Sequence, residues 1–209
     1  MTETISNTVQ LALTGLCTAC ALYRAFTTER RAWTLFALFA GLNFLGNLYW
    51  LLWLVFYGES PPYAYIPYLS WYASYLFLAL LLLQVKRPEQ PRLQARALWL
   101  VPVFAAGMFV FYVQYGDWVG NIVCAALMGL LLWQAIGGLL FLRGKTGAEA
   151  KNRFLYWAVL LFCFAEYALW TVSCFWSGDS LRYPYFWFDL LLSLCFPILL
   201  AAVERAVDA

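Results

Sequence analysis

The sequence predicts an all-α polytopic membrane protein with seven transmembrane helices, its N-terminus outside and its C-terminus inside. The first indication is composition: 65% of the 209 residues are hydrophobic and 11% are charged, whereas a soluble domain has about 25% charged residues. The second is that the apolar residues gather in seven long stretches. The third is that almost all basic residues fall on one side of those stretches. A water-soluble fold could not bury so much apolar surface.

Each of the seven stretches approaches the length of about 20 apolar residues that a helix needs to cross a bilayer. They cover roughly residues 5–26, 32–56, 65–85, 97–115, 119–142, 154–176 and 183–203. The connections are short and polar, with sequences such as "TTERR", "KRPEQPRLQAR" and "RGKTGAEAKNR". No stretch is left for a soluble domain, so we expect residues 1–209 to form a single membrane domain. The opening "MTETISNTVQ" lacks the basic segment of a signal peptide.

The basic residues predict the orientation. Twelve of the 13 Lys and Arg residues fall on one side of the predicted helices, and Arg182 is on the other. The twelve are Arg24, Arg30, Arg31, Lys86, Arg87, Arg92, Arg96, Arg143, Lys145, Lys151, Arg153 and Arg205. Because Lys and Arg are enriched in cytoplasmic loops, we expect this side to face the cytoplasm of a bacterial cell. Trp and Tyr gather towards the outer ends, which indicates either a headgroup-level belt or an aromatic cavity open to the outside.

A shift of 120 residues aligns two outer loops. "YGESPPYAYIPYLS" then aligns with "SGDSLRYPYFWFDL", and Trp50 aligns with Trp170. If this repeat is real, residues 5–85 and 119–203 are two halves and the helix at 97–115 connects them. Corresponding helices would run in the same direction, which is a parallel repeat about an axis along the membrane normal. Folds of this kind place their sites between the halves.

Glu166 stands out in "CFAEYALW", because no Lys, Arg or His lies within ten residues on either side. A charge at the bilayer centre costs about 2.5–3.5 kcal/mol on the insertion scale, so we expect a mostly neutral acid that faces the interior of the bundle. Asn43 and Asn47 lie at a suitable depth on the second predicted helix to form a hydrogen bond with it. A bound ligand or water could form this bond instead. Glu166 either holds helices together or contacts a ligand, proton or cation.

Further polar and aromatic residues could join Glu166. Asp189 lies about two turns into the last helix. It either forms an interfacial ion pair with Arg182 or is a water-exposed acid, or it lies at the mouth of the same cavity. Asn121 could equally cap a helix. Tyr72 and Tyr75 continue a stripe of phenols that either packs or lines a pocket. The candidate ligand-binding residues are Glu166, Asp189, Asn43, Asn47, Tyr72, Tyr75, Trp50, Trp170 and Asn121.

The composition also excludes several kinds of site. Histidine is absent, which removes haem axial histidine, His-zinc hydrolase chemistry and Ser-His or Cys-His nucleophile pairs. The six cysteines fall in apolar stretches and are interpreted as packing residues. A net charge of +2 is too small to indicate nucleic-acid binding. We therefore expect no catalytic residues, no metal and no cofactor.

The second and third predicted helices carry a resemblance to a known family. The stretch "GNLYWLLWLVFYGESPPYAYIPYLSWYASYLFLALLLL" resembles the membrane input domains that precede bacterial diguanylate cyclases and sensor kinases. In those domains a helix with Gly-Asp leads into a "PPxPSxAD" loop and a Tyr-rich helix. Here Gly46 and Asn47 stand where Gly-Asp is usual, Pro61 and Pro62 are kept, and Tyr68 occupies the position of the loop aspartate.

The last helix, "FDLLLSLCFPILLAA", is similar to the closing helix of those input domains, with Asp189 at its acidic position. The resemblance covers about a third of the chain and implies a sensor. Because no output domain follows Ala209, the chain would be a stand-alone input module or one excised from a longer protein, or it has another role. The 3+1+3 layout is also similar to the SWEET and PQ-loop transporters, although the prolines of their signature are missing. The last helix has no lysine for a retinal Schiff base.

These observations leave three functional hypotheses. The first is a membrane-embedded sensor or ligand-binding module that holds a small, partly apolar molecule in an outward-facing aromatic cavity. The second is a small transporter that uses Glu166 as a proton or substrate site. The third, ranked last, is an intramembrane enzyme with Glu166 and Asp189 as paired carboxylates. The expected partners are the bilayer and a small molecule or lipid, with further copies of the chain or a cytoplasmic signalling protein left open, and no nucleic acid.

Overall fold

The computed structural model describes all residues except 1, 60, 62–64, 87–95, 176–180 and 209. Every regular element in this part of the chain is a helix. The elements are α1 (Thr2–Thr28), α2 (Arg31–Tyr57), α3 (Tyr65–Val85), η1 (Arg96–Trp99), α4 (Leu100–Tyr112), α5 (Trp118–Phe141), η2 (Gly147–Ala150), α6 (Arg153–Phe175) and α7 (Pro184–Asp208). All seven predicted helices are therefore present, as an all-α bundle.

Six of these helices, all except α4, are long and apolar enough to cross a bilayer, and the chain is a multi-pass membrane protein. The fourth helix is shorter than the predicted 97–115. It begins after the 3₁₀ turn η1 and ends at Tyr112, because the following residues lead into the start of α5. There the side chain of Asp117 accepts a hydrogen bond from the backbone N–H of Gly120 at 2.6 Å and caps α5.

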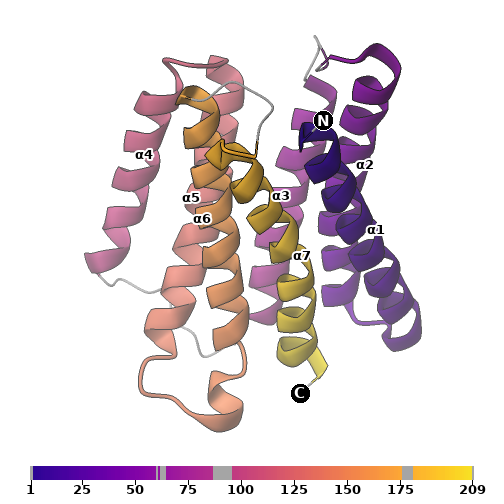
Figure 1. Ribbon diagram of the computed structural model, residues 1–209. Helices are drawn as coiled ribbons and strands as arrows, with labels where there is room; N and C mark the ends of the chain where they lie inside the picture. Colours follow the sequence, from indigo (N-terminus) through magenta and orange to yellow (C-terminus); the bar gives the residue numbers. More distant parts are fainter. Residues whose placement is uncertain (1, 60, 62–64, 87–95, 176–180, 209) are drawn as a thin grey trace.

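The six long helices follow one another around a closed cycle, which positions the site. Packing contacts link α1 to α2, α2 to α3, α3 to α5, α5 to α6, α6 to α7, and α7 back to α1. Helix α4 packs against α5 on the outside of the bundle (Figure 1). A twofold axis along the membrane normal would require this order, with α1, α2 and α3 corresponding to α5, α6 and α7. The superposition of the two halves stays a prediction.

Successive helices run in opposite directions (Figure 1), so the described basic residues of the α1–α2, α3–α4 and α5–α6 connections share one end of the bundle with the C-terminus. We call this the basic end. Contacts with α7 hold it together: Arg24 of α1 forms an ion pair with Glu204, and Arg30, which precedes α2, donates a hydrogen bond to the backbone carbonyl of Val207. Arg182 lies at the opposite end, which we call the outer end.

The topology prediction is that the basic end faces the cytoplasm, because Lys and Arg are retained on that side during insertion. A fluorescent protein fused to the C-terminus should therefore fluoresce, and alkaline phosphatase fused at the same place should be inactive. The same two reporters fused ahead of the N-terminus should give the opposite pattern. An active C-terminal phosphatase fusion would contradict the orientation.

Helix α1 turns its polar face inward. Its buried residues are Ser6, Asn7, Gln10, Thr14, Cys17 and Ala21, which recur every three or four residues. Large apolar residues such as Leu16 and Phe26 are exposed on the other side, where lipid is their expected solvent. The Thr14 hydroxyl donates a hydrogen bond to the backbone carbonyl of Gln10 at 2.7 Å. The polar stripe therefore brings hydrogen-bonding groups into the bundle rather than to the surface.

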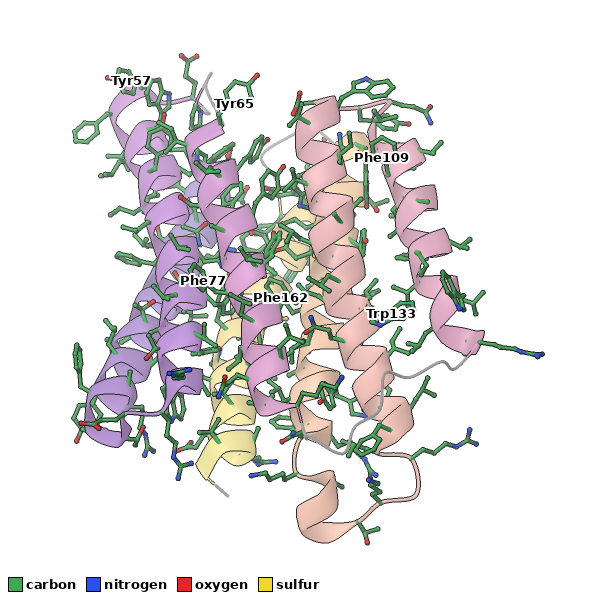
Figure 2. All side chains as sticks on the ribbon, turned by 180° about the vertical axis from the view of Figure 1, so that it is seen from behind. Tyr57, Tyr65, Phe77, Phe109, Trp133 and Phe162 are labelled. Carbon is green, nitrogen blue, oxygen red and sulfur yellow. The ribbon has the colours of Figure 1, made fainter. Side chains whose placement is uncertain are left out.

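Three phenylalanines close the interior halfway along the bundle. Phe39 of α2, Phe162 of α6 and Phe196 of α7 are fully buried. The ring centroids of Phe39 and Phe196 are 5.3 Å apart, and those of Phe39 and Phe162 are 5.5 Å apart. Figure 2 shows Phe162 midway between the two ends, with Tyr57 and Tyr65 at the outer end. This aromatic layer forms a floor beneath Glu166, which lies one turn above Phe162 on α6.

Candidate functional site

A cavity of about 440 Å³ lies in the outer half of the bundle, between the two predicted halves. Residues of all seven helices line it. At its deep end it reaches Glu166 and Asn43, each one turn above a phenylalanine of the floor. At its shallow end it reaches the α4–α5 connection, where Tyr115 is 51% exposed. The cavity thus runs from the middle of the bundle to its outer end.

Glu166 lies at the deep end and faces the interior, as the sequence predicts, with 5% of its surface exposed. Its carboxyl group lies next to the hydroxyl of Tyr75 on α3 and the indole N–H of Trp170, one turn further along α6, and both groups can donate a hydrogen bond to it. The expected partner was a polar group of α2, or else a bound molecule or water; among the described residues the nearby donors come from α3 and α6 instead of α2. Asn43 donates to Phe39 and Ser74, and Asn47 accepts from Trp71.

The two asparagines of α2, which lie one turn apart, both form hydrogen bonds with side chains of α3. The Nδ2 of Asn43 donates to the Oγ of Ser74 at 2.7 Å. The Oδ1 of Asn47 accepts from the Nε1 of Trp71 at 3.2 Å, while its own buried Nδ2 has no partner among the described residues. Asn43 still lines the cavity, and Asn47 lies behind Trp71. Asn47 thus supports the wall of the cavity instead of forming it.

Asp189 is 4% exposed and lies on α7, facing both α1 and the cavity. Its carboxyl group lies beside the Ser6 hydroxyl, which donates to the backbone carbonyl of Glu3 at 3.2 Å. It is also close enough to Glu166 for the two carboxyl groups to interact electrostatically. On α1, the neighbouring Glu3 accepts a hydrogen bond from the indole N–H of Trp50 at 3.2 Å. Of the alternatives left open for Asp189, exposure to water does not fit its burial, and the side chain lines the cavity.

Aromatic side chains form a large part of the wall. The aromatic members of the described lining are Trp50, Tyr68, Trp71, Tyr72, Tyr75, Tyr112, Tyr115, Trp170 and Tyr185. Ring contacts connect them across helices: the centroids of Trp50 and Trp71 are 6.0 Å apart and those of Tyr68 and Trp71 are 5.6 Å apart. Tyr68 and Trp170 meet from opposite halves at 6.3 Å. The phenol stripe of α3 therefore faces the cavity, which decides between the two alternatives that its spacing allowed.

Eight of the nine candidate residues line this one cavity, and Asn47 is the exception. Asn121, the candidate at the start of α5, lines it while donating hydrogen bonds to the backbone carbonyls of Asp117 at 2.7 Å and Tyr112 at 3.4 Å. It holds the α4–α5 connection in place, and the cap of α5 is Asp117.

Sequence reasoning missed several lining residues, chiefly Asn7 and Gln10 of α1. The signal that could have identified them is the polar stripe of α1, which shares the spacing of a buried helix face. Gln10 is 6% exposed, and its side-chain amide makes no hydrogen bond within the described part of the chain. Tyr112 and Tyr185 were also missed, because an aromatic residue near a helix end is expected in the headgroup region.

The tight packing of Gly46 against Trp71 gives a prediction for the cavity wall. A Cβ at Gly46 would lie 2.7 Å from the Trp71 Nε1, so Gly46→Ala should turn the indole away and break its bond to Asn47. We expect an altered near-ultraviolet circular dichroism spectrum and a loss of about 1–3 kcal/mol in the free energy of unfolding.

The control for this prediction is Gly41→Ala on the same helix, where the nearest atom is the Thr18 methyl group at 3.3 Å. It should behave nearly as the wild type. A Gly46→Ala spectrum identical to that of the wild type would mean that Trp71 is not held as described.

The cavity is lined by acidic, polar and apolar side chains. Its described lining carries carboxyl groups, amides, phenols, indoles, the Ser173 hydroxyl and the Cys174 thiol, but no lysine or arginine. No group of three or more His, Cys, Asp or Glu side chains among the described residues is arranged to hold a metal ion. Comparison with family models, with curated proteins and with solved structures gives no match, so the function is argued from the cavity itself.

Proposed function

We propose that the protein is a membrane-embedded ligand-binding module, acting as a sensor in the bacterial cytoplasmic membrane. It holds a small, partly apolar molecule in the aromatic cavity, which opens to the outside. The observation that carries this proposal is the cavity itself, with aromatic walls and two buried carboxyl groups at depth. Ligand sites in proteins have volumes of about 300–1,000 Å³, apolar walls and a few convergent polar groups, and the cavity of about 440 Å³ has all three properties.

A purely structural role explains the cavity less well. Protein interiors pack as densely as organic crystals and contain few voids larger than a water molecule. Two acids that only joined helices would be expected to face filled surroundings, whereas Glu166 and Asp189 both border open volume. Acids within membrane segments usually mark binding or proton sites. Binding is favoured over catalysis because no nucleophile with its base accompanies the two carboxyl groups within the described lining.

Helix α7 supports the sensor role. It carries Asp189 in the cavity and continues to the basic end, where Glu204 contacts Arg24 of α1 and Val207 contacts Arg30 of the α1–α2 connection. A ligand that draws Asp189 towards Glu166 would shift α7 relative to α1 and thereby change the surface at the cytoplasmic end. A transporter is the second candidate, favoured by the cyclic helix order in which the site lies between two sets of three helices.

Native mass spectrometry of the protein released from detergent micelles tests the binding proposal. The wild type should carry a co-purified small molecule or lipid. Gln10→Trp should lose it, because the indole fills the cavity while the replaced amide gives up no side-chain hydrogen bond. Leu16→Trp on the same helix should keep it, since Leu16 is 63% exposed on the outside of the bundle. Equal retention by all three proteins would overturn the proposal.

A transport assay distinguishes the sensor from the transporter. Proteoliposomes that contain the wild type should accumulate the identified molecule if the protein is a transporter, and should bind it without uptake if the protein is a sensor. Gln10→Trp is the negative control in both cases. Uptake driven by a pH gradient would favour the transporter over the sensor.

A further inference from the structure

We infer that the ligand of this cavity is an organic cation, either an amine in its ammonium form or a quaternary ammonium compound, with Glu166 and Asp189 as its counter-ions. The inference rests on the proposed function, since it names the chemical class of molecule that the same cavity binds. It is carried by the acidic side chains of the cavity, by its aromatic walls and by the hydrogen-bond donors that lie next to Glu166.

The ionisable acids of the described lining face no basic residue there. They are Asp117, Glu166 and Asp189, and Asp117 already serves as the cap of α5. Acids within membrane segments normally pair with one another or with basic groups. Glu166 and Asp189 both border the cavity, and its described lining contains no lysine or arginine. A cationic ligand would supply the charge that the protein itself does not place there.

The aromatic walls suit the same ligand. A cation within about 6 Å of the centre of an aromatic ring is attracted to its face, most strongly for Trp, and cages of such rings bind quaternary ammonium groups. Trp170 lies one turn above Glu166 and meets Tyr68 at 6.3 Å. Trp50 and Trp71 continue the wall at a centroid separation of 6.0 Å. These surfaces would hold the charged head and also the apolar part of the ligand.

The hydrogen bonds of Glu166 leave its oxygens as acceptors. An indole N–H only donates, so the Glu166 oxygen that faces Trp170 must accept, and the Tyr75 hydroxyl can donate as well. Two such donors stabilise a carboxylate once a cation compensates its charge. Gln10 lines the cavity with its amide unpartnered within the described residues, so its oxygen can accept from an ammonium N–H.

The dimensions favour a molecule over a metal ion. Calcium takes about 6–8 oxygen ligands at short distance, and the described residues contain no cluster of three or more candidate ligands. The volume of about 440 Å³ lies in the range of sites for organic molecules, about 300–1,000 Å³. A bare ion would leave most of the aromatic wall unused.

Isothermal titration calorimetry of the full chain in phosphatidylcholine nanodiscs tests the charge preference with three probes of similar shape. They are benzyltrimethylammonium, its neutral carbon isostere neopentylbenzene, and the anion phenylmethanesulfonate. Empty nanodiscs correct for partition into lipid. We expect the ammonium to bind about tenfold more tightly than the neutral isostere and the sulfonate not to bind.

The pH dependence of ammonium binding gives a second measurement. A quaternary ammonium keeps its charge at every pH, while protons compete with it for Glu166 and Asp189, so its affinity should rise with pH and fall as the solution is acidified. Other ionisable groups face the two acids: Tyr72 and Tyr75 of α3, Cys124 of α5, Cys163 of α6, Tyr185 and Cys195 of α7, and Glu3 of α1. Phenols and thiols ordinarily ionise only in alkaline solution, so they remain neutral across acidic and neutral pH.

The double variant Glu166→Gln with Asp189→Asn should lose the preference for the ammonium. Glu29→Gln, an exposed acid near the basic end, is the matched control and should keep it. If the wild type binds the neutral isostere as tightly as the ammonium and Gln10→Trp abolishes both, the cation inference fails and the binding proposal stands. If no probe binds and no molecule co-purifies, both fail. The preference and its pH dependence are measured on the wild type, so poor folding of a variant leaves the test intact.

Discussion

Replacing Gly138 by alanine is expected to destabilise the protein by about 3 kcal/mol, which is the upper part of the range for overpacking a filled core. A Cβ at this position would lie 2.3 Å from two ring atoms of Tyr156, and Tyr156 is 3% exposed. Gly138 of α5 therefore packs directly against the Tyr156 ring of α6, and the buried ring has little room to move. Unfolding in mixed sodium dodecyl sulfate micelles, followed by circular dichroism, measures the loss.

The matched control is Gly107→Ala on α4, where a new Cβ would meet no atom within 4 Å. Because alanine forms helices better than glycine by about 1 kcal/mol, this variant should be as stable as the wild type or slightly more stable. Equal unfolding curves for the two alanine variants would show that α5 and α6 do not pack at Gly138 as described.

Glu166→Ala is expected to cost about 1–3 kcal/mol of stability, because it strands the Tyr75 hydroxyl and the Trp170 indole N–H in the interior. Glu166→Gln keeps an acceptor of similar shape and should remain close to the wild type. The same unfolding experiment compares them, and a Gln variant as unstable as the Ala variant would contradict the hydrogen-bonding role.

Infrared difference spectra report the protonation state of Glu166. Without a ligand we expect a protonated carboxyl band that disappears in Glu166→Gln, because an acid buried without a cation favours its neutral form. On addition of benzyltrimethylammonium the band should decrease as the acid ionises and its proton passes to water. A band that is absent in the ligand-free wild type would show that Glu166 is already ionised.

The helices could be predicted from the sequence because the physics behind them is local. A run of apolar residues long enough to span the bilayer has to be helical, and the basic residues mark the ends of each run. The length of the fourth helix was overestimated because apolar residues continue past Tyr112 into the α4–α5 connection. An apolar stretch shows where a helix can form, and the cap at Asp117 determines where the next one begins.

The cavity could be predicted only in part. Polar residues such as Glu166, Asn43 and Asp189 stand out in apolar surroundings, and lipid excludes them from the surface. Their partners depend on how each helix is rotated and on which helices are neighbours. For this reason the sequence pointed to α2 as the partner of Glu166, whereas α3 supplies Tyr75. The lining of α1 was missed because its polar residues were not compared with the helical period.

The most direct test of an outward-open, cation-accepting cavity uses Cys174, which lines it. In a variant that keeps Cys174 and replaces the other five cysteines by alanine, two membrane-impermeant thiol reagents are applied to the outside of intact cells. One is trimethylammonioethyl methanethiosulfonate and the other is the anionic sulfonatoethyl analogue. Relative to their rates with a free thiol in solution, the cationic reagent should modify Cys174 faster, and Gln10→Trp should slow it. Modification only from the cytoplasmic side, or a faster reaction with the anionic reagent, would contradict the account.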